Sequence, residues 1–459
     1  MDTRCICCTF VCLFASATIC PAVGPYVITD VGDLGGGESR AYAVNAAGEV
    51  VGRSRAIVES HYVWRAFLYS GGALLDLGTL GGDESSAWDV NDAGEVVGWA
   101  SNPSGPARAF LYSGGTMEEV DPGFGGWTGV AYGINDSSQV VGVAARKYTL
   151  LQYDHAFRWT DANEDGVVDA GEVLELLALN GQTTSTSYAR DVNEAGQVVG
   201  YSRAGLHDHA FFFHDANGDG VVDPGELVDL GTFGGNASLA YGINDAGQVV
   251  GGAQTAASRT HAFVWTDANG NWALDAGEMA DLGTLGGDSS EARAISQSGQ
   301  VVGYAQNADA AVRAFVYAGG KMLDLNELIH SEAGWTLQEA WDVNQSGQIV
   351  GIGKNPGNMT HGFVLTPAAG GDANLDGCVD GLDYNLWSLH YLEQQVPPWS
   401  EGGCEYGNFN ADEVVDGLDY NVWSLNYRLG CEGAAVHEPA LAVLLVAGLG
   451  PVLRRRANR

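Results

Sequence analysis

The sequence predicts an all-β protein, a seven-bladed β-propeller closed by an N-terminal strand, followed by a small α-helical domain. Three observations support this prediction. A nine-residue phrase of the form VNxxGxVVG recurs seven times. Each repeat contains about four short strand-like runs, which is the content of one propeller blade. The two ends of the repeat array look like complementary parts of a single blade.

The phrase itself predicts a turn followed by a buried strand. Its seven closing glycines are 46, 44, 58, 51, 52 and 48 residues apart, at these positions: Gly52, Gly98, Gly142, Gly200, Gly251, Gly303 and Gly351. A unit of this size depends on its neighbours to bury its apolar face. In VNDAGEVVG, Asn91 and Gly94 occupy the first and last positions of a type I turn. The short β-branched run 95–98 then predicts a buried strand.

A second phrase predicts the next strands of each repeat. It reads RAFLY, HAFRW or a relative, and begins at Arg65, Arg108, His155, His209, His261, Arg313 and His361. Its aromatic-rich alternation suits a strand with one face in a core. A Gly-Gly turn follows in several repeats, and we expect a last strand to end in DLGTLGG (76–82) or its equivalent. Because histidine and arginine exchange freely at one repeat position, we expect that residue to be a polar cap or strand-edge residue.

The ends of the array predict a closed ring. Residues 26–36 supply the fourth-strand phrase before any VNxxG phrase has occurred, and the seventh repeat stops at 361–367 without a fourth strand. An N-terminal strand that completes the last blade would remove exposed sheet edges. An open solenoid would need polar capping repeats instead. The third repeat departs most from the pattern, with LELLALNG (174–181) in place of DLGTLGG.

Charge and targeting segments limit the function further. The net charge of −36 and pI near 4.3 argue against nucleic acid or an anionic membrane as a sequence-blind partner. Residues 1–22 predict a secretory signal peptide that contains five of the eight cysteines. Of the three that remain, Cys404 and Cys431 could close a loop, and the alternative is that Cys378, Cys404 and Cys431 are free thiols. We therefore expect export, with the propeller at 24–367 and a linker at 368–371.

Three repeats replace the Gly-Gly turn with a twelve-residue acidic loop that fits calcium. The loops lie in the three longest repeat intervals, as insertions into a hairpin. Oxygen ligands at positions 1, 3, 5, 9 and 12 with a glycine bend at 6 form the calcium-loop pattern, and position 7 lends a backbone carbonyl. The candidate ligands are Asp161, Asn163, Asp165, Val167, Asp169 and Glu172; then Asp215, Asn217, Asp219, Val221, Asp223 and Glu226; then Asp267, Asn269, Asn271, Asp275 and Glu278. Trp272 replaces the glycine in the third loop, and the alternative for all three is a solvated acidic turn.

Residues 372–431 contain a near-duplicated pair of sequences, DANLDGCVDGLDYNLWSLHY (372–391) and NFNADEVVDGLDYNVWSLNY (408–427). In each, an acidic loop runs into an amphipathic helix. The pair resembles a type I dockerin, which implies two half-EF-hand units that bind Ca²⁺ and dock to a cohesin-like partner. The ligands implied by this resemblance are Asp372, Asn374, Asp376, Asp380 and Asp383, then Asn408, Asn410, Asp412, Asp416 and Asp419. Glu413 replaces the bend glycine of the second loop, so we expect that site to be weaker.

Two further resemblances bear on family and location. The alternation of RAF or HAF with DLGTLGG and VNxxGxVVG over 26–367 is similar to the HAF family of extracellular repeat proteins, which implies no established activity. The segment 434–459, with Glu438-Pro439, an apolar run (440–453) and an arginine cluster (454–456), resembles a PEP-CTERM sorting signal. That resemblance implies cleavage by a C-terminal sorting enzyme after a transient membrane contact. The alternative is an ordinary tail anchor.

No motif for catalysis stands out. After the expected signal peptide, the sequence lacks a GxSxG elbow, an HExxH helix, a phosphate loop and a CxxC pair. We therefore expect no catalytic residue and no organic cofactor. The favoured hypothesis is an exported, surface-located, calcium-binding propeller that acts as a binding or matrix protein, with a cohesin-like protein or a cell-surface polysaccharide as partner. The alternative is a polysaccharide-degrading glycosidase or lyase on the same scaffold.

Overall fold

The computed structural model describes residues 25–148, 151–163, 168–169, 171–390, 415 and 417–429. The expected signal peptide and the sorting segment lie outside these residues. So do several expected calcium ligands: Asp165, Val167, Asn408, Asn410, Asp412 and Asp416.

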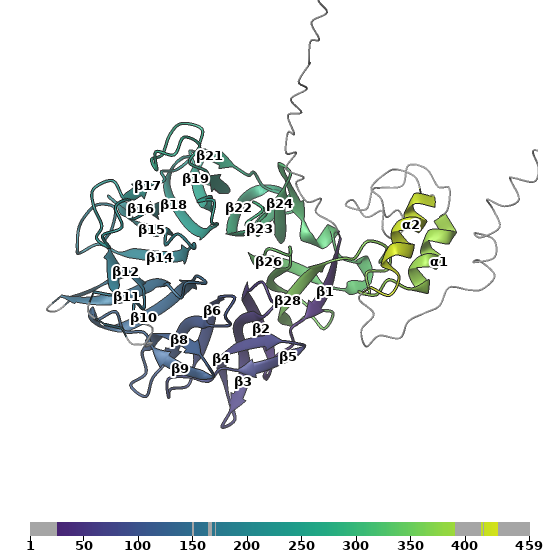
Figure 1. Ribbon diagram of the computed structural model, residues 1–459, viewed down its shortest axis with the longest axis horizontal. Helices are drawn as coiled ribbons and strands as arrows, with labels where there is room; N and C mark the ends of the chain where they lie inside the picture. Colours follow the sequence, from purple (N-terminus) through teal and green to yellow (C-terminus); the bar gives the residue numbers. More distant parts are fainter. Residues whose placement is uncertain are drawn as a thin grey trace, which may run out of the picture.

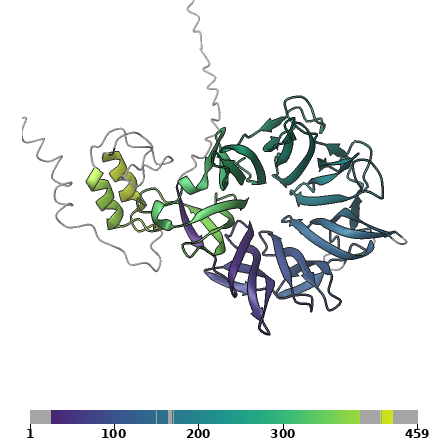
Figure 2. The ribbon, with the colours of Figure 1, turned by 180° about the vertical axis from the view of Figure 1, so that it is seen from behind.

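The described chain forms seven four-stranded antiparallel sheets arranged as blades around a central axis (Figures 1 and 2), which confirms the predicted seven-bladed propeller. The blades, each from its inner to its outer strand, have the following bounds. Blade 1 has β2 (Gly35–Val44), β3 (Val50–Val58), β4 (His61–Ser70) and β5 (Ala73–Asp76); blade 2 has β6 (Ser85–Val90), β7 (Val96–Ser101), β8 (Ala107–Ser113) and β9 (Thr116–Glu119); blade 3 has β10 (Gly125–Ile134), β11 (Val140–Tyr148), β12 (Leu151–Trp159) and β13 (Val173–Leu176). Blade 4 has β14 (Ser187–Val192), β15 (Val198–Ala204), β16 (His207–Phe213) and β17 (Leu227–Asp229); blade 5 has β18 (Gly234–Ile243), β19 (Val249–Thr255), β20 (Thr260–Trp265) and β21 (Met279–Asp281); blade 6 has β22 (Gly286–Ile295), β23 (Val301–Asn307), β24 (Val312–Ala318) and β25 (Lys321–Asp324).

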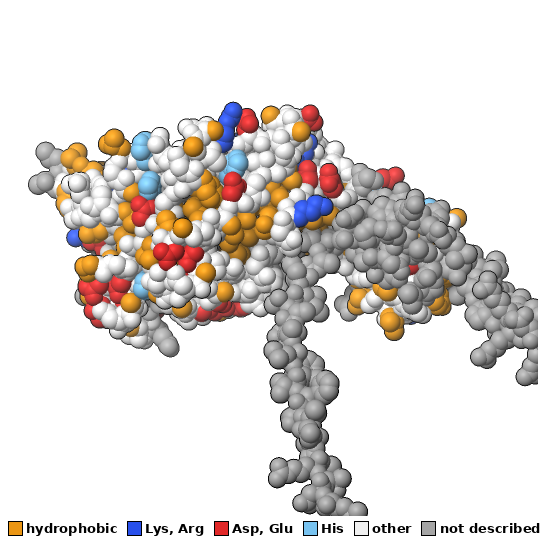
Figure 3. All heavy atoms as spheres, turned by 90° about the horizontal axis from the view of Figure 1, so that it is seen from above, with side chains coloured by type: hydrophobic (Ala, Val, Ile, Leu, Met, Phe, Trp, Pro, Cys, Tyr) orange, Lys and Arg blue, Asp and Glu red, His pale blue; other side chains and the backbone are white. Residues whose placement is uncertain are grey.

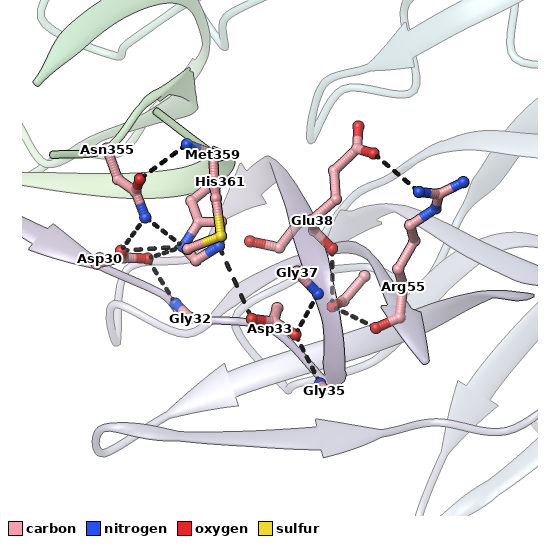
Figure 4. A network of polar contacts seen from close by, with 12 residues as sticks. Asp30, Gly32, Asp33, Gly35, Gly37, Glu38, Arg55, Asn355, Met359 and His361 are labelled. Carbon is pink, nitrogen blue, oxygen red and sulfur yellow. Dashed lines mark hydrogen bonds and ion pairs between the residues drawn. The ribbon is translucent and has the colours of Figure 1, made fainter. Parts of the chain in front are cut away.

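Blade 7 closes the ring. It combines β26 (Thr336–Val343), β27 (Ile349–Lys354) and β28 (Thr360–Pro367) with the N-terminal β1 (Tyr26–Asp30), which pairs antiparallel with β28. At this junction His361 Nδ1 lies 2.8 Å from an Asp30 carboxylate oxygen, which also accepts a 2.8 Å hydrogen bond from the Gly32 amide (Figure 4). The predicted closure by the N-terminal strand is therefore confirmed.

Each blade contributes one buried phenylalanine from its second phrase to the contact between blades. These side chains are inaccessible to solvent: Phe67, Phe110, Phe157, Phe211, Phe263, Phe315 and Phe363. Serine hydroxyls connect neighbouring blades as well. For example, the Ser85 hydroxyl of blade 2 accepts a 2.9 Å hydrogen bond from the Ala66 amide of blade 1 and donates one to the Gly78 carbonyl.

The fourth strands end earlier than expected. In blade 1, β5 ends at Asp76, so the rest of DLGTLGG crosses to the next blade instead of belonging to the strand. The glycines at the end of this phrase begin the following inner strand in several blades, as Gly234 does in β18. The divergent third repeat still supplies a fourth strand, because β13 pairs with β12 in the usual position.

The antiparallel order gives the disc two different faces. The VNxxG turns and the three acidic loops, which join third to fourth strands, lie on one face, called here the turn face. The hairpins between second and third strands and the DLGTLGG crossings lie on the opposite, hairpin face. Acidic side chains are spread over the edge of the disc that Figure 3 shows, with basic side chains in only a few places.

The described helical structure is small. Two 3₁₀ turns, η1 (Leu325–Glu327) and η2 (Ser331–Ala333), precede β26. After the propeller come α1 (Gly381–His390) and α2 (Gly417–Asn426), which lie side by side next to blade 7 (Figure 1). Their contact contains a buried aromatic cluster that includes Tyr384, Trp387 and Trp423. None of the helices within the described residues is long and apolar enough to cross a membrane.

Candidate ligand site in the central channel

A β-bulge in every inner strand places side chains in the channel. In blade 2, Ala87 pairs with Gly98 and Asp89 pairs with Val97, so Trp88 is left without a partner in the ladder. The same irregularity occurs at the equivalent position of all seven blades. Because a bulge re-aims side chains, two successive residues of each inner strand line the channel.

The bulge also explains the closing glycine of the repeated phrase. A Cβ at Gly98 would overlap the carbonyl oxygen of Ser86, just before the bulge. The equivalent glycine in each other blade meets the corresponding carbonyl in the same way. The glycine is therefore required by the close approach of two backbones.

The residue left out of the ladder is aromatic or arginine in every blade: Tyr42, Trp88, Tyr132, Arg190, Tyr241, Arg293 and Trp341. Together with the residues that follow them, they line a pocket of about 440 Å³, called here the channel pocket. Ligand pockets typically have volumes of about 300–1,000 Å³. The pocket has an aromatic side, formed by the rings of blades 7, 1, 2 and 3, and a cationic side, where the guanidinium groups of blades 4 and 6 lie next to the Tyr241 ring of blade 5.

The aromatic side is a continuous arc. The Tyr42 ring lies 4.9 Å from Trp341 and stacks on Trp88 with the ring centroids 4.5 Å apart. Trp88 in turn lies 5.7 Å from Tyr132. These rings hold one another in place, which gives a bound molecule a preformed apolar surface.

On the cationic side, Arg190 lies in a cage of tyrosines. Its guanidinium is 4.0 Å from the Tyr132 ring centroid, 5.2 Å from Tyr201 and 5.9 Å from Tyr241. It donates a 2.8 Å hydrogen bond to the Tyr201 hydroxyl, and no carboxylate of the described chain lies within ion-pair distance. Burial lowers the pKa of Arg190, but the tyrosines around it outweigh this effect, so the group stays charged. Arg293 differs, because its guanidinium lies 2.9 Å from Glu291.

Three aspartates line the pocket one position further along the inner strands. Each accepts one amide hydrogen bond from its own strand and one from the next blade: Asp89 from Val90 and Ile134, Asp191 from Val192 and Ile243, and Asp342 from Val343 and Val44. These six hydrogen bonds measure 2.7–2.9 Å. The three carboxylates therefore connect blades 2 to 3, 4 to 5, and 7 to 1.

The pKa values of these carboxyls are raised. Burial raises the pKa of Asp191 to about 7 and that of Asp342 to about 6, although the amide hydrogen bonds oppose the shift. Burial also raises the pKa of Asp89 well above its usual range, with a further contribution from the charges of Asp191 and Asp342. The carboxyls consequently carry less negative charge near neutral pH than three exposed aspartates would.

Towards the turn face, a ring of asparagines narrows the channel. Asn45 Nδ2 donates a 3.1 Å hydrogen bond to the backbone carbonyl oxygen of Asn91. Asn91 Nδ2 donates in the same way to the backbone carbonyl oxygen of Asn135. The pattern continues through blades 4 and 5 and returns from Asn344 to Asn45. Ser296 takes the asparagine position in blade 6. The ring borders a smaller hollow of about 180 Å³.

Three N–H groups of the channel pocket have no hydrogen-bond partner in the described part of the chain. They are Trp88 Nε1, Arg190 Nε and Arg293 Nε, and all three nitrogens are inaccessible to solvent. Buried donors normally have a partner. Because a water-sized molecule cannot touch these nitrogens, they are not exposed to a ligand in the pocket.

The expected calcium loops have the geometry of a closed turn. In the second loop the Asp215 carboxylate accepts hydrogen bonds from the Gly218 and Gly220 amides, and the buried Glu226 carboxylate accepts from Ala216 and Asp223. Asn217 Nδ2 donates to Asp219 and Asp223, so these side chains meet in one place. Val221, the expected carbonyl ligand, is exposed.

The third loop repeats this arrangement without the glycine. Trp272 adopts φ +51° at the bend and stacks on Phe212, with the ring centroids 5.3 Å apart. The Asp267 carboxylate accepts a hydrogen bond from the Trp272 amide. The side-chain amides of Asn269 and Asn271 both donate to the Asp275 carboxylate. The Glu278 carboxylate accepts hydrogen bonds from the backbone amides of Ala268 and Asp275. Packing on the neighbouring blade thus holds a backbone conformation that otherwise favours glycine.

The described part of the first loop contains Asp161, Asn163, Asp169 and Glu172. Asn163 Nδ2 donates a 3.0 Å hydrogen bond to Asp169, and Glu172 accepts amides of Ala162 and Asp169. The amide of Asp169 is the largest of the effects that hold the pKa of Glu172 below its usual value.

In the C-terminal unit the first expected loop is compact. Asp372 accepts amides of Asp376 and Gly377, and Asp383 accepts amides of Ala373, Asn374 and Asp380. Burial raises the pKa of Asp372 to about 7, with a contribution from Asp383, whose own pKa burial raises to about 6. Of the second loop, Asp419 is described and is buried. Trp423 Nε1 donates a 2.8 Å hydrogen bond to the Asp380 carbonyl and so joins α2 to this loop.

Within the ranges that the structure describes, no group of three or more His, Cys, Asp or Glu side chains is clustered closely enough to hold a metal ion. The calcium pattern also uses asparagine and backbone oxygens, and calcium binding stays a prediction. Cys378 is disulfide-bonded, so the alternative of three free thiols is wrong. The expected pairing of Cys404 with Cys431 lies outside the described residues.

The exchange of histidine and arginine in the second phrase has a structural cause. In six blades this residue pairs with the acidic residue at the end of the fourth strand: His155 with Glu175, His209 with Asp229, His261 with Asp281, His361 with Asp30, Arg108 with Glu119 and Arg313 with Asp324. Either side chain can form this pair, as expected for a residue with a structural role.

The channel pocket was not predicted from the sequence. A signal was present, because the residue three positions before the asparagine of the phrase, or before Ser296 in the sixth repeat, is Tyr, Trp or Arg in all seven repeats. It was not recognisable as a channel position, since only the bulge turns that residue towards the axis.

Comparison with known proteins yields a partial family match. Residues 125–276, less than half of the chain, match a family described as a protein of unknown function, DUF3466. No curated protein matches the chain. A puromycin-hydrolyzing peptidase from Mycobacterium tuberculosis is 13% identical with a TM-score of 0.47, over 74% of this chain and 54% of the peptidase. TolB from Acinetobacter baumannii is 11% identical with a TM-score of 0.36, over 73% of this chain and 64% of TolB.

A lectin from Aleuria aurantia is 12% identical with a TM-score of 0.30, over 72% of this chain and 91% of the lectin. The chain spans about half the length of the puromycin-hydrolyzing peptidase. The DUF3466 match begins with the inner strand of blade 3 and ends in the acidic loop of blade 5.

Proposed function

We propose that this protein is a binding protein, not an enzyme, and that its ligand occupies the channel pocket. The observation that carries this proposal is the use of the three pocket carboxylates. Asp89, Asp191 and Asp342 each accept hydrogen bonds from backbone amides of two blades, so they hold neighbouring blades together. A glycosidase needs two carboxyls free to act as acid and as base or nucleophile.

The rest of the pocket suits recognition. Ligand sites are mostly apolar surfaces with a few polar groups that set orientation. The arc of Trp341, Tyr42 and Trp88 supplies such a surface, and the guanidinium groups of Arg190 and Arg293 supply polar contacts. A polysaccharide of the cell surface is the ligand class that we propose, since the faces of sugar rings pack on aromatic side chains.

A panel of polysaccharides and oligosaccharides, offered to the full chain, tests this function. We expect binding without turnover, and we expect Trp341→Ala to weaken the binding while Trp127→Ala, an exposed tryptophan outside the pocket, leaves it unchanged. Turnover that disappears in Asp191→Asn would establish the enzyme alternative. Binding unaffected by Trp341→Ala would place the ligand elsewhere.

We propose that calcium stiffens three hairpins of the turn face. The support is the convergence of oxygen-bearing side chains in the second and third loops, around Asp223 and Asp275. Calorimetric titration of calcium into the metal-stripped full chain should show several sites, and Glu226→Gln should remove one of them. Glu118→Gln, an acidic residue of the turn face outside the loops, is the matched control. A titration without heat and without a rise in melting temperature would refute the proposal.

We also propose that the C-terminal unit docks the protein to a cohesin-like partner after export. The packing of Trp423 against the first loop supports a unit in which metal binding and folding are coupled. A full-length chain and one truncated after residue 371 should differ in capture of a cohesin module. The export and sorting proposal is checked by protease accessibility on intact cells, with and without residues 434–459. Protection from protease in both forms would exclude surface exposure.

A further inference from the structure

Resting on the binding function proposed above, the geometry points to an anionic ligand: we infer that the channel pocket recognises a carboxylate-bearing saccharide, with Arg190 as its main charged contact. The chain carries 57 acidic and 21 basic residues. Even so, two arginines line this one pocket: Arg190 lies next to Tyr132, and Arg293 lies 4.6 Å from the ring centroid of Trp341, at the other end of the aromatic arc.

Arg190 is the decisive residue because its charge is not neutralised. A buried guanidinium usually has a carboxylate partner, since an unpaired buried charge is costly. Here the partners are three tyrosine rings and one tyrosine hydroxyl. Cation–π contacts offset part of the desolvation but leave a net positive charge. A ligand carboxylate would complete the pairing.

The polar groups of the pocket also favour an anionic ligand. Arg190 donates to the Tyr201 hydroxyl and, like any guanidinium, carries further N–H donors and no acceptor. The pocket aspartates, by contrast, already accept two amide hydrogen bonds each. A ligand rich in acceptor oxygens therefore matches the guanidinium group.

The polarity of the pocket sets the orientation of the ligand. The rings of Trp341, Tyr42 and Trp88 form one side, and Arg190 lies on the other, beyond Tyr132. A uronic acid has a ring face that can pack on the arc and a carboxylate that can reach the guanidinium. A neutral sugar would leave Arg190 unpaired.

The test compares trigalacturonate with its fully methyl-esterified, neutral form, by calorimetry on the full chain at one fixed calcium concentration. We expect the acid to bind the wild-type protein about ten- to a hundredfold more tightly than the ester, as expected for a hydrogen bond between charged groups. Arg190→Gln should abolish that preference. Arg259→Gln, which makes the same change of charge at an exposed arginine paired with Asp288, should retain it.

Each outcome decides between ligand class and binding function. If acid and ester bind equally, or Arg190→Gln weakens both alike, the inference of an anionic ligand is wrong while pocket binding stands. If a chitosan trimer, which is cationic, binds more tightly than trigalacturonate, the charge argument is also wrong. If no oligosaccharide binds, the proposed binding function fails together with the inference. Should Arg190→Gln not fold, the comparison of acid and ester on the wild-type protein remains decisive.

Discussion

Replacing Asp191 by asparagine should make the stability of the propeller less sensitive to pH. The Asp191 carboxylate accepts a 2.8 Å hydrogen bond from Val192 and a 2.9 Å hydrogen bond from Ile243, and so joins β14 to β18. Burial raises its pKa from 3.8 to about 7. Asparagine keeps the size and one acceptor oxygen but cannot titrate.

The magnitude follows from the shift. Because the folded-state pKa lies above the unfolded-state value, the folded protein binds the extra proton, and the stabilisation is fully present only below pH 3.8. It is lost as the pH rises through about 7. A shift of roughly three units corresponds to about 4 kcal/mol, and about two of those units fall between pH 5 and pH 8. The free energy of unfolding of the wild-type protein, relative to the variant, should therefore fall by about 3 kcal/mol over that interval.

Urea denaturation of both proteins at pH 5 and pH 8 measures this difference. The carboxyls of Asp89 and Asp342 are common to both proteins, so their titrations largely cancel. Asp342→Asn should show a smaller change over the same interval, because the pKa of Asp342 is raised only to about 6. A difference between wild type and Asp191→Asn that stays constant or grows with pH would refute the reasoning.

Three further perturbations test the architecture. Gly98→Ala puts a Cβ onto a backbone carbonyl and should lower the free energy of unfolding by about 3 kcal/mol in urea denaturation, whereas Gly129→Ala has room for the methyl and should cost little; equal losses would contradict the steric argument. Deleting residues 26–36 leaves β28 as an unpaired edge, so we expect a lower melting temperature and concentration-dependent association; unchanged melting would contradict ring closure by β1. Replacing Asp372 and Asp376 together by alanine should unfold the C-terminal unit and leave the melting of the propeller unchanged, and joint melting in calorimetry would show that the two are one cooperative unit.

The repeated phrases determined the blade number and the site of closure because each residue type in them has a local structural role, such as forming a turn or a strand. Gly94 has φ +78° at the end of its turn, and its amide donates a 3.0 Å hydrogen bond to the Asn91 carbonyl. The fourth-strand phrase at 26–36 had no blade of its own to complete. The pairing of β1 with β28 gives this N-terminal strand a partner and also supplies the fourth strand that the last blade lacked.

The acidic loops were recognisable for the same reason, since their ligand spacing is contained in twelve consecutive residues. Trp272 was the exception. Its place at a glycine position looked unfavourable in the sequence, but the stacking on Phe212 of the preceding blade supports the conformation. Contacts between repeats are invisible in a pattern read along one repeat.

The sequence by itself determined an array of seven β-rich units and its closure, because these depend on periodicity, turn chemistry and matching ends. Only the tertiary structure showed the channel pocket. Its residues, Tyr42, Trp88, Arg190, Arg293 and Trp341 among them, are tens to hundreds of residues apart in the chain. They meet because seven identical bulges turn one side chain per blade towards a common axis, and that axis exists only once the ring has closed.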